Sequence, residues 1–304
     1  MAPHKVFVCA ATGTQGGAVA RQLRAIGWDV NTTTRDPNSP AAQALTSIGI
    51  NVHQGAWTET AALESAIAGC DLLFLNMMPD LANPPSEAEF GTNVLRIAKA
   101  AGVTHVVYSS GIALPGAESN PFVQMAFAAK GVLEKAVQES GFQHWTILRP
   151  GFFMANYLVP KVNMLYPGAA ETGLFELAFN ADTELPMIDH EDIGASAVAA
   201  FQNPDKFHQQ AIDLISEVVT VEKAMETMRR GMGRNIRAKY LTDEELEEAK
   251  ARNPMLAIQE VLRLISSAGN VPTAKEWGVA VGTFEQFVER EKKDFEETYQ
   301  NVSN

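Results

Sequence analysis

The chain has 304 residues, 46% hydrophobic and 20% charged, which suits one large folded domain or a domain with a smaller addition. Its net charge is -12, and no run of Lys and Arg reverses it, so we expect no direct nucleic-acid partner. Cys9 and Cys70 lie in apolar runs, which argues against a disulfide framework, and no cluster has metal-ligand spacing. Without a charged leader or an apolar window of membrane-spanning length, we expect a cytosolic protein that uses no metal.

Six short apolar runs alternate with helical patterns in the first half of the chain. The runs cover residues 5–10, 29–34, 50–55, 71–76, 105–110 and 144–150. Because they are apolar on both faces and separated by helix-length segments, they predict a parallel sheet covered on each side. The helical patterns between them end at Gly27, Gly69 and Gly102, which are typical helix stops. This repetition predicts an α/β fold with a Rossmann-type, doubly wound parallel sheet.

The pattern changes after Pro150. Residues 151–189 are rich in aromatics, Met, Pro and Gly and show no clean period, and residues 189–204 then predict a helix with Asp192 near its start. Three amphipathic helices are expected over residues 220–233, 242–269 and 283–300. We therefore expect a first domain of residues 1–150 and a smaller, mostly helical, substrate-side lobe of residues 151–304 that shares some sheet elements with it.

The stretch "VCAATGTQGGAVA", residues 8–20, joins the first strand to the first helix. Gly13, Gly16 and Gly17 begin that helix, where glycine lets the backbone approach a pyrophosphate and free N–H groups meet its charge. Ala10 stands where the first glycine of such a loop falls. One methyl is tolerable there at negative φ, whereas a left-handed conformation costs roughly 1 kcal/mol. The alternative is a plain tight turn that packs the helix on the strand.

The end of the second predicted strand indicates which dinucleotide is bound. An acidic residue there would accept hydrogen bonds from the NAD ribose, but this strand ends at Arg35, which can clamp a 2′-phosphate. Asn38 and Ser39 follow as further donors. The sequence therefore favours NADP(H), with a solvated Arg35 paired to Asp36 as the alternative.

The segments "AATGTQGG", "HVVYSSG", "LRPGFFMANYL" and "IDHEDIG" resemble the NmrA-like family of atypical short-chain dehydrogenase/reductases, and the resemblance runs over nearly the whole chain. It implies a Rossmann domain that binds NADP(H) and a small C-terminal lobe. The family includes reductases related to isoflavone and phenylcoumaran-ether reductases, and also redox-sensing regulators.

Carried onto this chain, the resemblance places Gly13 to Gln15 at the pyrophosphate, Arg35 at the 2′-phosphate, and Met77, Met78 and residues 152–155 on the nicotinamide side. Where many relatives have an acid after the third strand, this chain has Ala56 and Trp57, so we expect an apolar or aromatic wall at the adenine. The complete set of cofactor-binding candidates is Ala10, Ala11, Thr12, Gly13, Thr14, Gln15, Arg35, Asn38, Ser39, Ala56, Trp57, Asn76, Met77, Met78, Ser109, Lys130, Phe152, Phe153, Met154 and Ala155.

Lys130 is the candidate catalytic residue. The resemblance places it near the nicotinamide ribose and the substrate, and its apolar helical neighbours predict partial burial, which suits a proton donor. Ordinary short-chain dehydrogenases carry a tyrosine four residues earlier, and this chain has Ala126. Lys130 could instead hold only the ribose or be a surface lysine. Ser109 and Ser110 either orient a substrate carbonyl or cap the following turn.

Two further groups of residues allow a functional and a structural interpretation. A set of aromatics would form a pocket for a flat, apolar substrate, or else the lobe's core: Phe152, Phe153, Tyr157, Phe175 and Phe179. Asp189, His190 and Glu191 form an acid/base cluster or, more simply, the entry of a helix.

Two functions follow from these observations. The first is an NADPH-dependent reductase that transfers hydride to a small aromatic or polyketide-like molecule. The second is an NADP(H)-binding sensor or corepressor-like regulator without catalysis, which the missing tyrosine favours and for which the acidic segment 241–253 would be a protein-binding surface. A non-redox lyase or isomerase ranks lower. The oligomeric state is open, since no sustained heptad pattern occurs.

Overall fold

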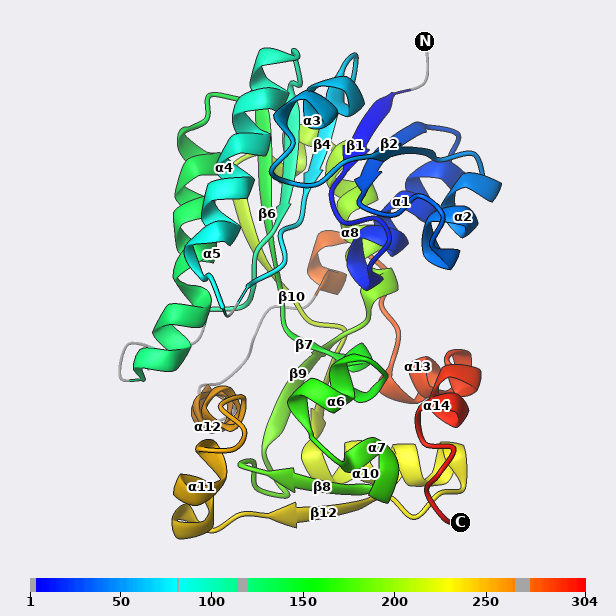
Figure 1. Cartoon of the computed structure of the whole chain (residues 1–304), viewed down its shortest axis with the longest axis vertical. Helices are drawn as coiled ribbons and strands as arrows, with labels where there is room; N and C mark the ends of the chain where they lie inside the picture. Colours follow the sequence, from blue (N-terminus) through cyan, green and yellow to red (C-terminus); the bar gives the residue numbers. More distant parts are fainter. Residues whose placement is uncertain (1–3, 81, 114–119, 266–273) are drawn as a thin grey trace. The chain divides into compact units, whose positions relative to one another are not determined.

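The computed structural model describes residues 4–80, 82–113, 120–265 and 274–304 (Figure 1). The chain forms two compact units, each built from segments that are separate in the sequence. The first, the sheet unit, comprises Met1–Ile112, Met125–Pro150 and His190–Leu214. The second unit comprises Ala113–Gln124, Gly151–Asp189 and Ile215–Asn304. The chain therefore leaves the sheet unit after Pro150, as the sequence pattern indicates, and returns to it for 25 residues, 190 to 214 inclusive.

The sheet unit contains a seven-stranded sheet in the order β10-β6-β5-β4-β1-β2-β3, and every pairing in it is parallel. All six predicted strands are confirmed, and β10 was not predicted. The order reverses direction between β1 and β4, so the carboxyl ends of these two strands form the switch point where ligands of such sheets bind. The strands are β1 (Lys5–Val8), β2 (Asp29–Thr34), β3 (Asn51–Gln54), β4 (Leu72–Leu75), β5 (His105–Ser109), β6 (His144–Pro150) and β10 (Gln210–Leu214).

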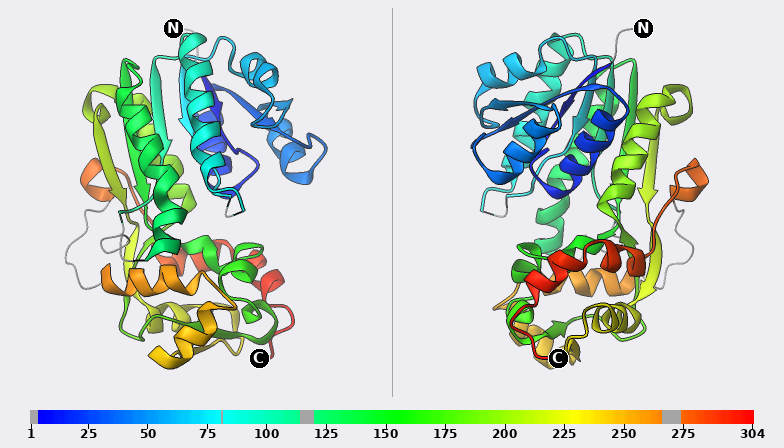
Figure 2. Two further views of the ribbon diagram at one scale, coloured as in Figure 1. Left: turned by 60° about the vertical axis from the view of Figure 1, so that its left-hand side comes forward. Right: turned by 90° about the vertical axis from the view of Figure 1, so that its right-hand side faces the viewer.

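Helices cover both faces of this sheet (Figures 1 and 2). On one face, α3, α4 and α5 share an apolar core with β1, β4 and β5. On the other, α1 and α8 pack against each other and against the strands. Gly27, Gly69 and Gly102 have positive φ of 86°, 71° and 91°, which confirms them as the helix stops. The helices are α1 (Thr14–Ala25), α2 (Pro40–Ser47), α3 (Thr60–Ile67), α4 (Pro85–Ala100), α5 (Pro121–Glu139), α8 (His190–Gln202) and α9 (Pro204–Phe207).

The second unit combines helices with two small sheets. One sheet has the order β11-β9-β7 and the other pairs β12 with β8. Its strands are β7 (Phe152–Phe153), β8 (Leu174–Leu177), β9 (Glu184–Ile188), β11 (Glu217–Thr220) and β12 (Arg237–Tyr240). Its helices are η2 (Met154–Tyr157), α6 (Lys161–Leu165), α7 (Ala169–Thr172), α10 (Val221–Met232), α11 (Asp243–Lys250), α12 (Leu256–Ile265), η3 (Ala274–Trp277), α13 (Phe284–Arg290) and α14 (Lys292–Thr298).

The expectation of three long helices in this unit needs correction. Only α10 forms as one piece. The segment expected from 242 to 269 divides into α11 and α12 at Asn253 and Pro254, because proline cannot continue the helix before it, and residues 266–269 lie outside the described part. The segment 283–300 divides into α13 and α14 at Glu291.

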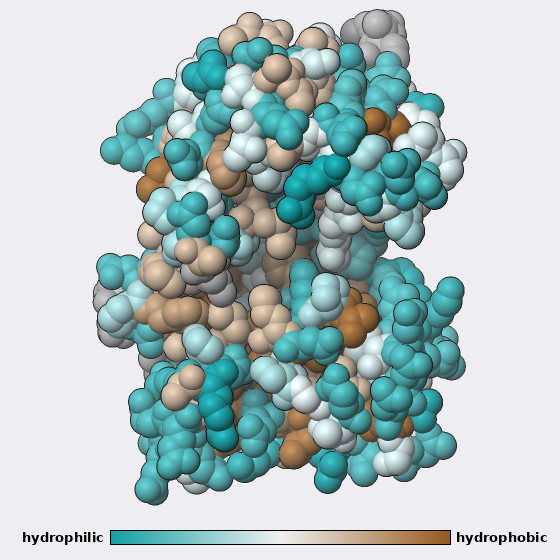
Figure 3. Space-filling view, viewed as in Figure 1, coloured by the Kyte–Doolittle hydropathy of each residue, from teal (hydrophilic) through white to brown (hydrophobic). Residues whose placement is uncertain are grey.

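Hydrophilic residues cover most of the face shown in Figure 3, with apolar residues scattered among them. Eight large apolar side chains are classed as exposed among the described residues, and Met78 is the most exposed of these at 65%. None of the described helices is both long and apolar enough to cross a membrane.

Candidate functional site

The N-terminus of α1 lies directly after β1 and has no side-chain cap. Gly13 is its N-cap residue, with extended φ and ψ of -98° and 179°. In contrast, α2 and α11 are capped by the hydroxyls of Ser39 and Thr242. The first backbone N–H groups of α1 therefore have no partner within the helix or from a capping side chain. Together with the helix dipole, such N–H groups form an anion-binding site, so this loop fits the pyrophosphate of a dinucleotide.

The turn before α1 depends on Ala10 and Gly16. The amide of Gly13 donates to the carbonyl of Ala10 at 2.9 Å, which closes the turn. Ala10 has φ of +52°, so it adopts the left-handed conformation and not the negative φ that would tolerate its methyl. A Cβ on Gly16 would lie 2.4 Å from the Ala10 oxygen and 2.5 Å from the Cys9 oxygen. Gly16 is therefore the glycine that this turn requires sterically.

A short chain of polar side chains joins the first turn of α1 to the carboxyl ends of β4 and β5 at the switch point. Gln15 Nε2 donates to Asn76 Oδ1 at 3.2 Å, and Ser109 Oγ donates to Gln15 Oε1 at 2.7 Å. Asn76 follows β4, and Ser109 ends β5. The structure thus brings three predicted residues together. The side chain of Gln15 is engaged within the protein, which leaves its backbone amide for an anion.

Arg35 lies just after β2 and is exposed. In the described part of the chain it makes no ion pair, so the alternative of an Arg35–Asp36 pair is wrong. Asp36 instead accepts from the Asn38 amide at 2.9 Å. Ser39 caps α2, since its hydroxyl accepts from the Ala42 amide at 3.4 Å. Among the described residues, the side chains of Arg35 and Asn38 therefore have no partner, whereas the hydroxyl of Ser39 already caps α2.

The other cofactor-binding candidates divide between the two units. In the sheet unit, Trp57 is half-buried against the core shared by α3 and α4, Met77 is buried and Met78 is exposed. Residues 152–155 belong to the second unit, where Phe152, Met154 and Ala155 are buried in its core and Phe153 is partly buried.

Lys130 forms a largely buried ion pair with Glu87. Its Nζ donates to Glu87 Oε1 at 2.9 Å, and the two side chains are 17% and 2% exposed. The prediction that Lys130 is partly buried is confirmed. Glu87 was missed, because in the sequence it is simply an acid in the first turn of α4, a common helix-entry residue.

Tyr108 is a second residue that sequence reasoning missed near this pair. It lies in β5 and is fully buried. Burial, and next the negative charge of Glu87, raise the pKa of Tyr108 well above its usual range. A tyrosine that acts as catalytic acid needs the opposite shift, so Tyr108 does not replace the tyrosine that is missing at Ala126.

The interpretation of the aromatic set as a substrate pocket is wrong for most of its members. Tyr157, Phe175 and Phe179 are each 1% exposed or less and belong to the core of the second unit. Their rings pack on one another; for example, the ring centroids of Tyr157 and Phe175 are 6.0 Å apart. Phe152 joins the same core, so only Phe153 retains a partly exposed ring.

Asp189, His190 and Glu191 form the entry of a helix, as the simpler interpretation predicted. His190 begins α8, with Glu191 in its first turn. Asp189 accepts two hydrogen bonds from Arg290, at 2.6 and 2.9 Å. Although burial alone would raise it, the pKa of Glu191 is lowered by hydrogen bonds from Gln22 and Arg21. The carboxylates of Asp189 and Glu191 are thus both bonded to side chains of the protein.

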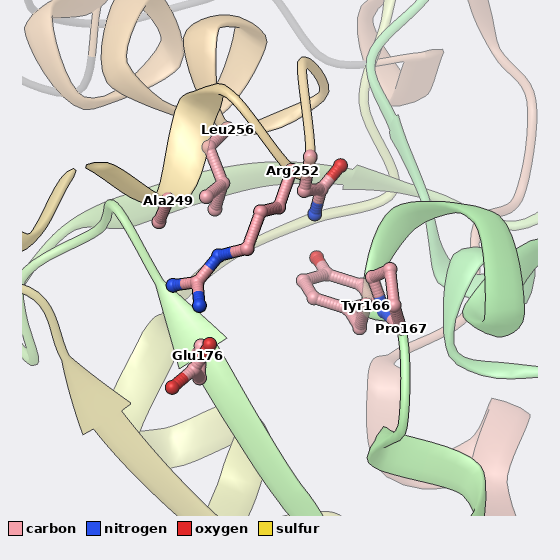
Figure 4. Close-up of a pocket in the computed structure, with 7 residues that line it drawn as sticks. Tyr166, Pro167, Glu176, Ala249, Arg252 and Leu256 are labelled. Atoms are coloured by element: carbon pink, nitrogen blue, oxygen red, sulfur yellow. The ribbon is translucent and has the colours of Figure 1, made fainter. Parts of the chain in front are cut away.

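A separate pocket of about 240 Å³ lies within the second unit (Figure 4). Arg252, just after α11, extends toward Glu176 of β8, and Tyr166 lies beside them. The remaining lining residues are Pro167, Ala249, Asn253 and Leu256. None of these residues is among the cofactor-binding candidates. Among all the described residues, no group of three His, Cys, Asp or Glu side chains is arranged to hold a metal ion.

Two curated relatives resemble the chain over most of its length. The "NmrA-like family domain-containing oxidoreductase malD" of Malbranchea aurantiaca is 30% identical over 272 residues, which cover 83% of this chain and 81% of the relative. The "(4-alkanoyl-5-oxo-2,5-dihydrofuran-3-yl)methyl phosphate reductase" of Streptomyces griseus subsp. griseus is 31% identical over 254 residues, or 83% of this chain and 80% of the relative.

Solved structures share the fold at lower identity. The NADPH-dependent quinone oxidoreductase QOR2 of Escherichia coli, complexed with NADPH, has a TM-score of 0.71 at 23% identity and covers 94% of this chain and 99% of its own. Nmra, a negative transcriptional regulator, has a TM-score of 0.67 at 18% identity, with coverages of 96% and 97%. At these identities the likeness concerns the fold. In a comparison with known families, residues 3–303 match the NmrA-like family, and the chain therefore belongs to it.

Proposed function

We propose that the protein is an NADPH-dependent reductase of a small aromatic or polyketide-like molecule. The observation that carries the cofactor assignment is the combination of an uncapped α1 N-terminus with the guanidinium of Arg35, which follows the neighbouring strand β2 and bonds to no other described residue. The first fits a pyrophosphate, and the second fits a 2′-phosphate that NAD lacks. The solved structure of the Escherichia coli quinone oxidoreductase QOR2, which shares the fold, is a complex with NADPH and agrees with this choice.

The reductase assignment rests on Lys130 and on the relatives. Several are named as oxidoreductases or reductases, among them the phosphate reductase of Streptomyces griseus and an NAD(P)H azoreductase of Xenophilus azovorans. When bound, a reduced nicotinamide supplies a hydride. In our proposal the ammonium of Lys130 donates the accompanying proton, while Gln15, Asn76 and Ser109 keep the carboxyl edge of the sheet in its geometry.

Thermal unfolding with each dinucleotide tests the cofactor assignment. At about 100 times its Kd, NADPH should stabilise the protein by about 2.7 kcal/mol, and NADH should do so only at higher concentration. Arg35→Ala should remove this preference without changing the effect of NADH, because only the 2′-phosphate contact is lost. Arg96→Ala, an exposed arginine on α4, is the matched control and should retain the preference. Equal stabilisation by both dinucleotides in the wild type would contradict the assignment.

A second candidate function is an NADP(H)-binding regulator without catalysis. Ala126 in place of the usual tyrosine favours it, and one solved relative is described as a negative transcriptional regulator. Turnover separates the two. A reductase should consume NADPH with at least one member of a panel of quinones, enones, imines and azo compounds. A regulator should bind NADPH and consume none.

A further inference from the structure

The pocket of about 240 Å³ in the second unit is formed by three segments that lie far apart in the sequence (Figure 4). Tyr166 and Pro167 follow α6, Glu176 lies in β8, and the residues from Ala249 to Leu256 span the end of α11 and the start of α12. All of them belong to the second unit. The pocket is therefore a feature of this unit alone, separate from the glycine loop and Arg35.

The turn between α11 and α12, which forms one wall of the pocket, is fixed by side-chain hydrogen bonds. Asn253 Nδ2 donates to the carbonyl of Leu165 at 3.1 Å, and Asn253 Oδ1 accepts from the Met255 amide at 3.1 Å. Ala249 and Leu256 belong to a small buried apolar cluster. Because this wall is already ordered, a ligand would pay little entropy to organise it.

Arg252 brings a positive charge to the pocket that no described residue neutralises. Its side chain is exposed and extends toward Glu176 (Figure 4). The guanidinium forms no hydrogen bond or ion pair within the described part of the chain. A guanidinium is always charged, and its N–H groups form a fork that matches a carboxylate. Arg252 therefore offers a binding group for a carboxylate ligand.

Glu176 brings a negative charge to the same pocket. Its ion-pair partner is Lys239, at 3.5 Å, but Lys239 Nζ lies nearer to Glu245, at 3.1 Å. One lysine is thus shared between two carboxylates. Glu176 is therefore only partly neutralised, and it forms no ion pair with Arg252.

Two opposite charges at one pocket limit the kind of ligand that fits. A simple anion would be attracted by Arg252 but repelled by Glu176, and a simple cation would experience the reverse. The volume is below the about 300–1,000 Å³ of sites for drug-sized ligands, so the ligand is small. Several other lining side chains are apolar or aromatic: Tyr166, Pro167, Ala249 and Leu256.

We infer that this pocket binds a small zwitterion, namely an α-amino acid with an apolar side chain. Its carboxylate would accept hydrogen bonds from Arg252, its ammonium would donate to Glu176, and its side chain would contact Tyr166 and Leu256. The inference does not depend on the proposed reductase function, because it concerns a different ligand at a different site.

Calorimetric titration of the full-length protein tests the need for both charges. The ligands are L-leucine, isocaproate, which lacks the amino group, and isoamylamine, which lacks the carboxylate. The wild type should bind leucine at least about 10-fold more tightly than either analogue, as expected when a charge-assisted hydrogen bond is lost. Isocaproate binding as tightly as leucine would show that the ammonium has no partner and would overturn the inference.

Variants of the two charged residues should change ligand preference in opposite directions. Arg252→Met should weaken leucine binding by about 10-fold and strengthen isoamylamine binding, because the repulsion of the amine is removed. Glu176→Gln should also weaken leucine binding but strengthen isocaproate binding. Both side chains are exposed, so both variants should fold, which thermal unfolding checks.

Two exposed residues of the same unit provide matched controls. Arg237→Met on β12 and Glu184→Gln on β9 make the same chemical changes outside the pocket and should bind leucine like the wild type. Equal leucine binding in the pocket variants and the controls would place the ligand elsewhere and overturn the inference. Failure of the wild type to bind leucine, valine, methionine or phenylalanine would also overturn it, and a normal thermal shift with NADPH in that sample would leave the proposed function intact.

Discussion

Ala10 and Gly16 share one turn but tolerate change differently. Ala10 has φ of +52°, which costs an alanine about 1 kcal/mol. A glycine there would relieve this strain but lose about 0.4–1 kcal/mol through the greater freedom of the unfolded chain. The two effects nearly cancel, which explains how the loop accepts alanine at the position where glycine is expected. Gly16 has no such compensation, because the obstacle is backbone at 2.4 Å.

The first residue-scale prediction follows from this contrast. Gly16→Ala should destabilise the protein by about 1–3 kcal/mol, because the backbone of residues 9 and 10 must shift. It should also weaken NADPH binding, since the same backbone forms the pyrophosphate loop. Urea unfolding and thermal shift with NADPH measure the two effects.

Gly131 is the control for that substitution. It lies within α5, and a Cβ there would contact nothing within 4 Å. Gly131→Ala should therefore stabilise the protein by about 0.5–1 kcal/mol, the usual gain of alanine over glycine inside a helix. Equal stability of Gly16→Ala and the wild type would contradict the steric reading of the turn.

At the scale of elements, a strand such as β4 that is buried along its whole length was predictable, whereas β10 and the two-residue β7 were not. β4 reads "LLFL" and is buried at all four residues, so its composition alone indicates a central parallel strand. β10 reads "QAIDL" and alternates in burial at the sheet edge, and β7 has only two residues. Such segments become strands through partners that lie far away in the sequence, which a local pattern does not contain.

The same reasoning applies to the site. The positions of the glycine loop and of Arg35 could be located from the sequence, because each lies directly after a predicted strand. Glu87 could not, because its partner Lys130 is 43 positions away and the pair forms only when α4 and α5 pack. The aromatic set was misread for a related reason. Aromatics at irregular spacing look alike in a pocket and in a core until burial distinguishes them.

Strands β5 and β6 and the turn between α9 and β10 place three histidines together, which predicts a dependence of stability on pH. The ring centroid of His144 in β6 lies 5.5 Å from that of His105 in β5 and 5.3 Å from that of His208. Burial, followed by the charges of His144, His208 and His4, lowers the pKa of His105 from 6.5 to about 3. The folded state thus keeps His105 neutral, while the unfolded chain takes up a proton below about pH 6.5.

Stability should therefore be lost as the pH falls from 6.5 toward 3, with a contribution from His105 of about 2 kcal/mol at pH 5. His105→Phe, which keeps an aromatic ring beside Phe201, should lose this part of the pH dependence in urea unfolding at pH 7 and pH 5. His53→Phe on the more open strand β3 is the control and should change it less. An unchanged pH dependence in His105→Phe would show that the cluster does not set it.

For the whole molecule, the path of the chain means that the sheet unit is completed late. After Pro150 the chain builds part of the second unit and then returns with α8 and β10. β10 covers the edge of β6, and α8 packs on α1 so closely that a Cβ on Gly194 would lie 3.2 Å from the backbone of Ala18. Hydrogen bonds from Arg21 and Gln22 to Glu191 fasten the same two helices. A boundary drawn at residue 150 would cut through this core.

Fragments of the chain test that conclusion. A fragment of residues 1–150 should fail to unfold cooperatively, because the buried face of α1 and the edge of β6 lose their covers and stay exposed. Residues 1–150 joined by a flexible Gly/Ser linker to residues 190–214 should regain a cooperative transition and a thermal shift with NADPH, since every strand of the sheet is then present. Circular dichroism on heating and binding of a hydrophobic dye distinguish the two fragments. A cooperative transition in residues 1–150 alone would place the complete core before Pro150 and reduce α8 and β10 to additions on its surface.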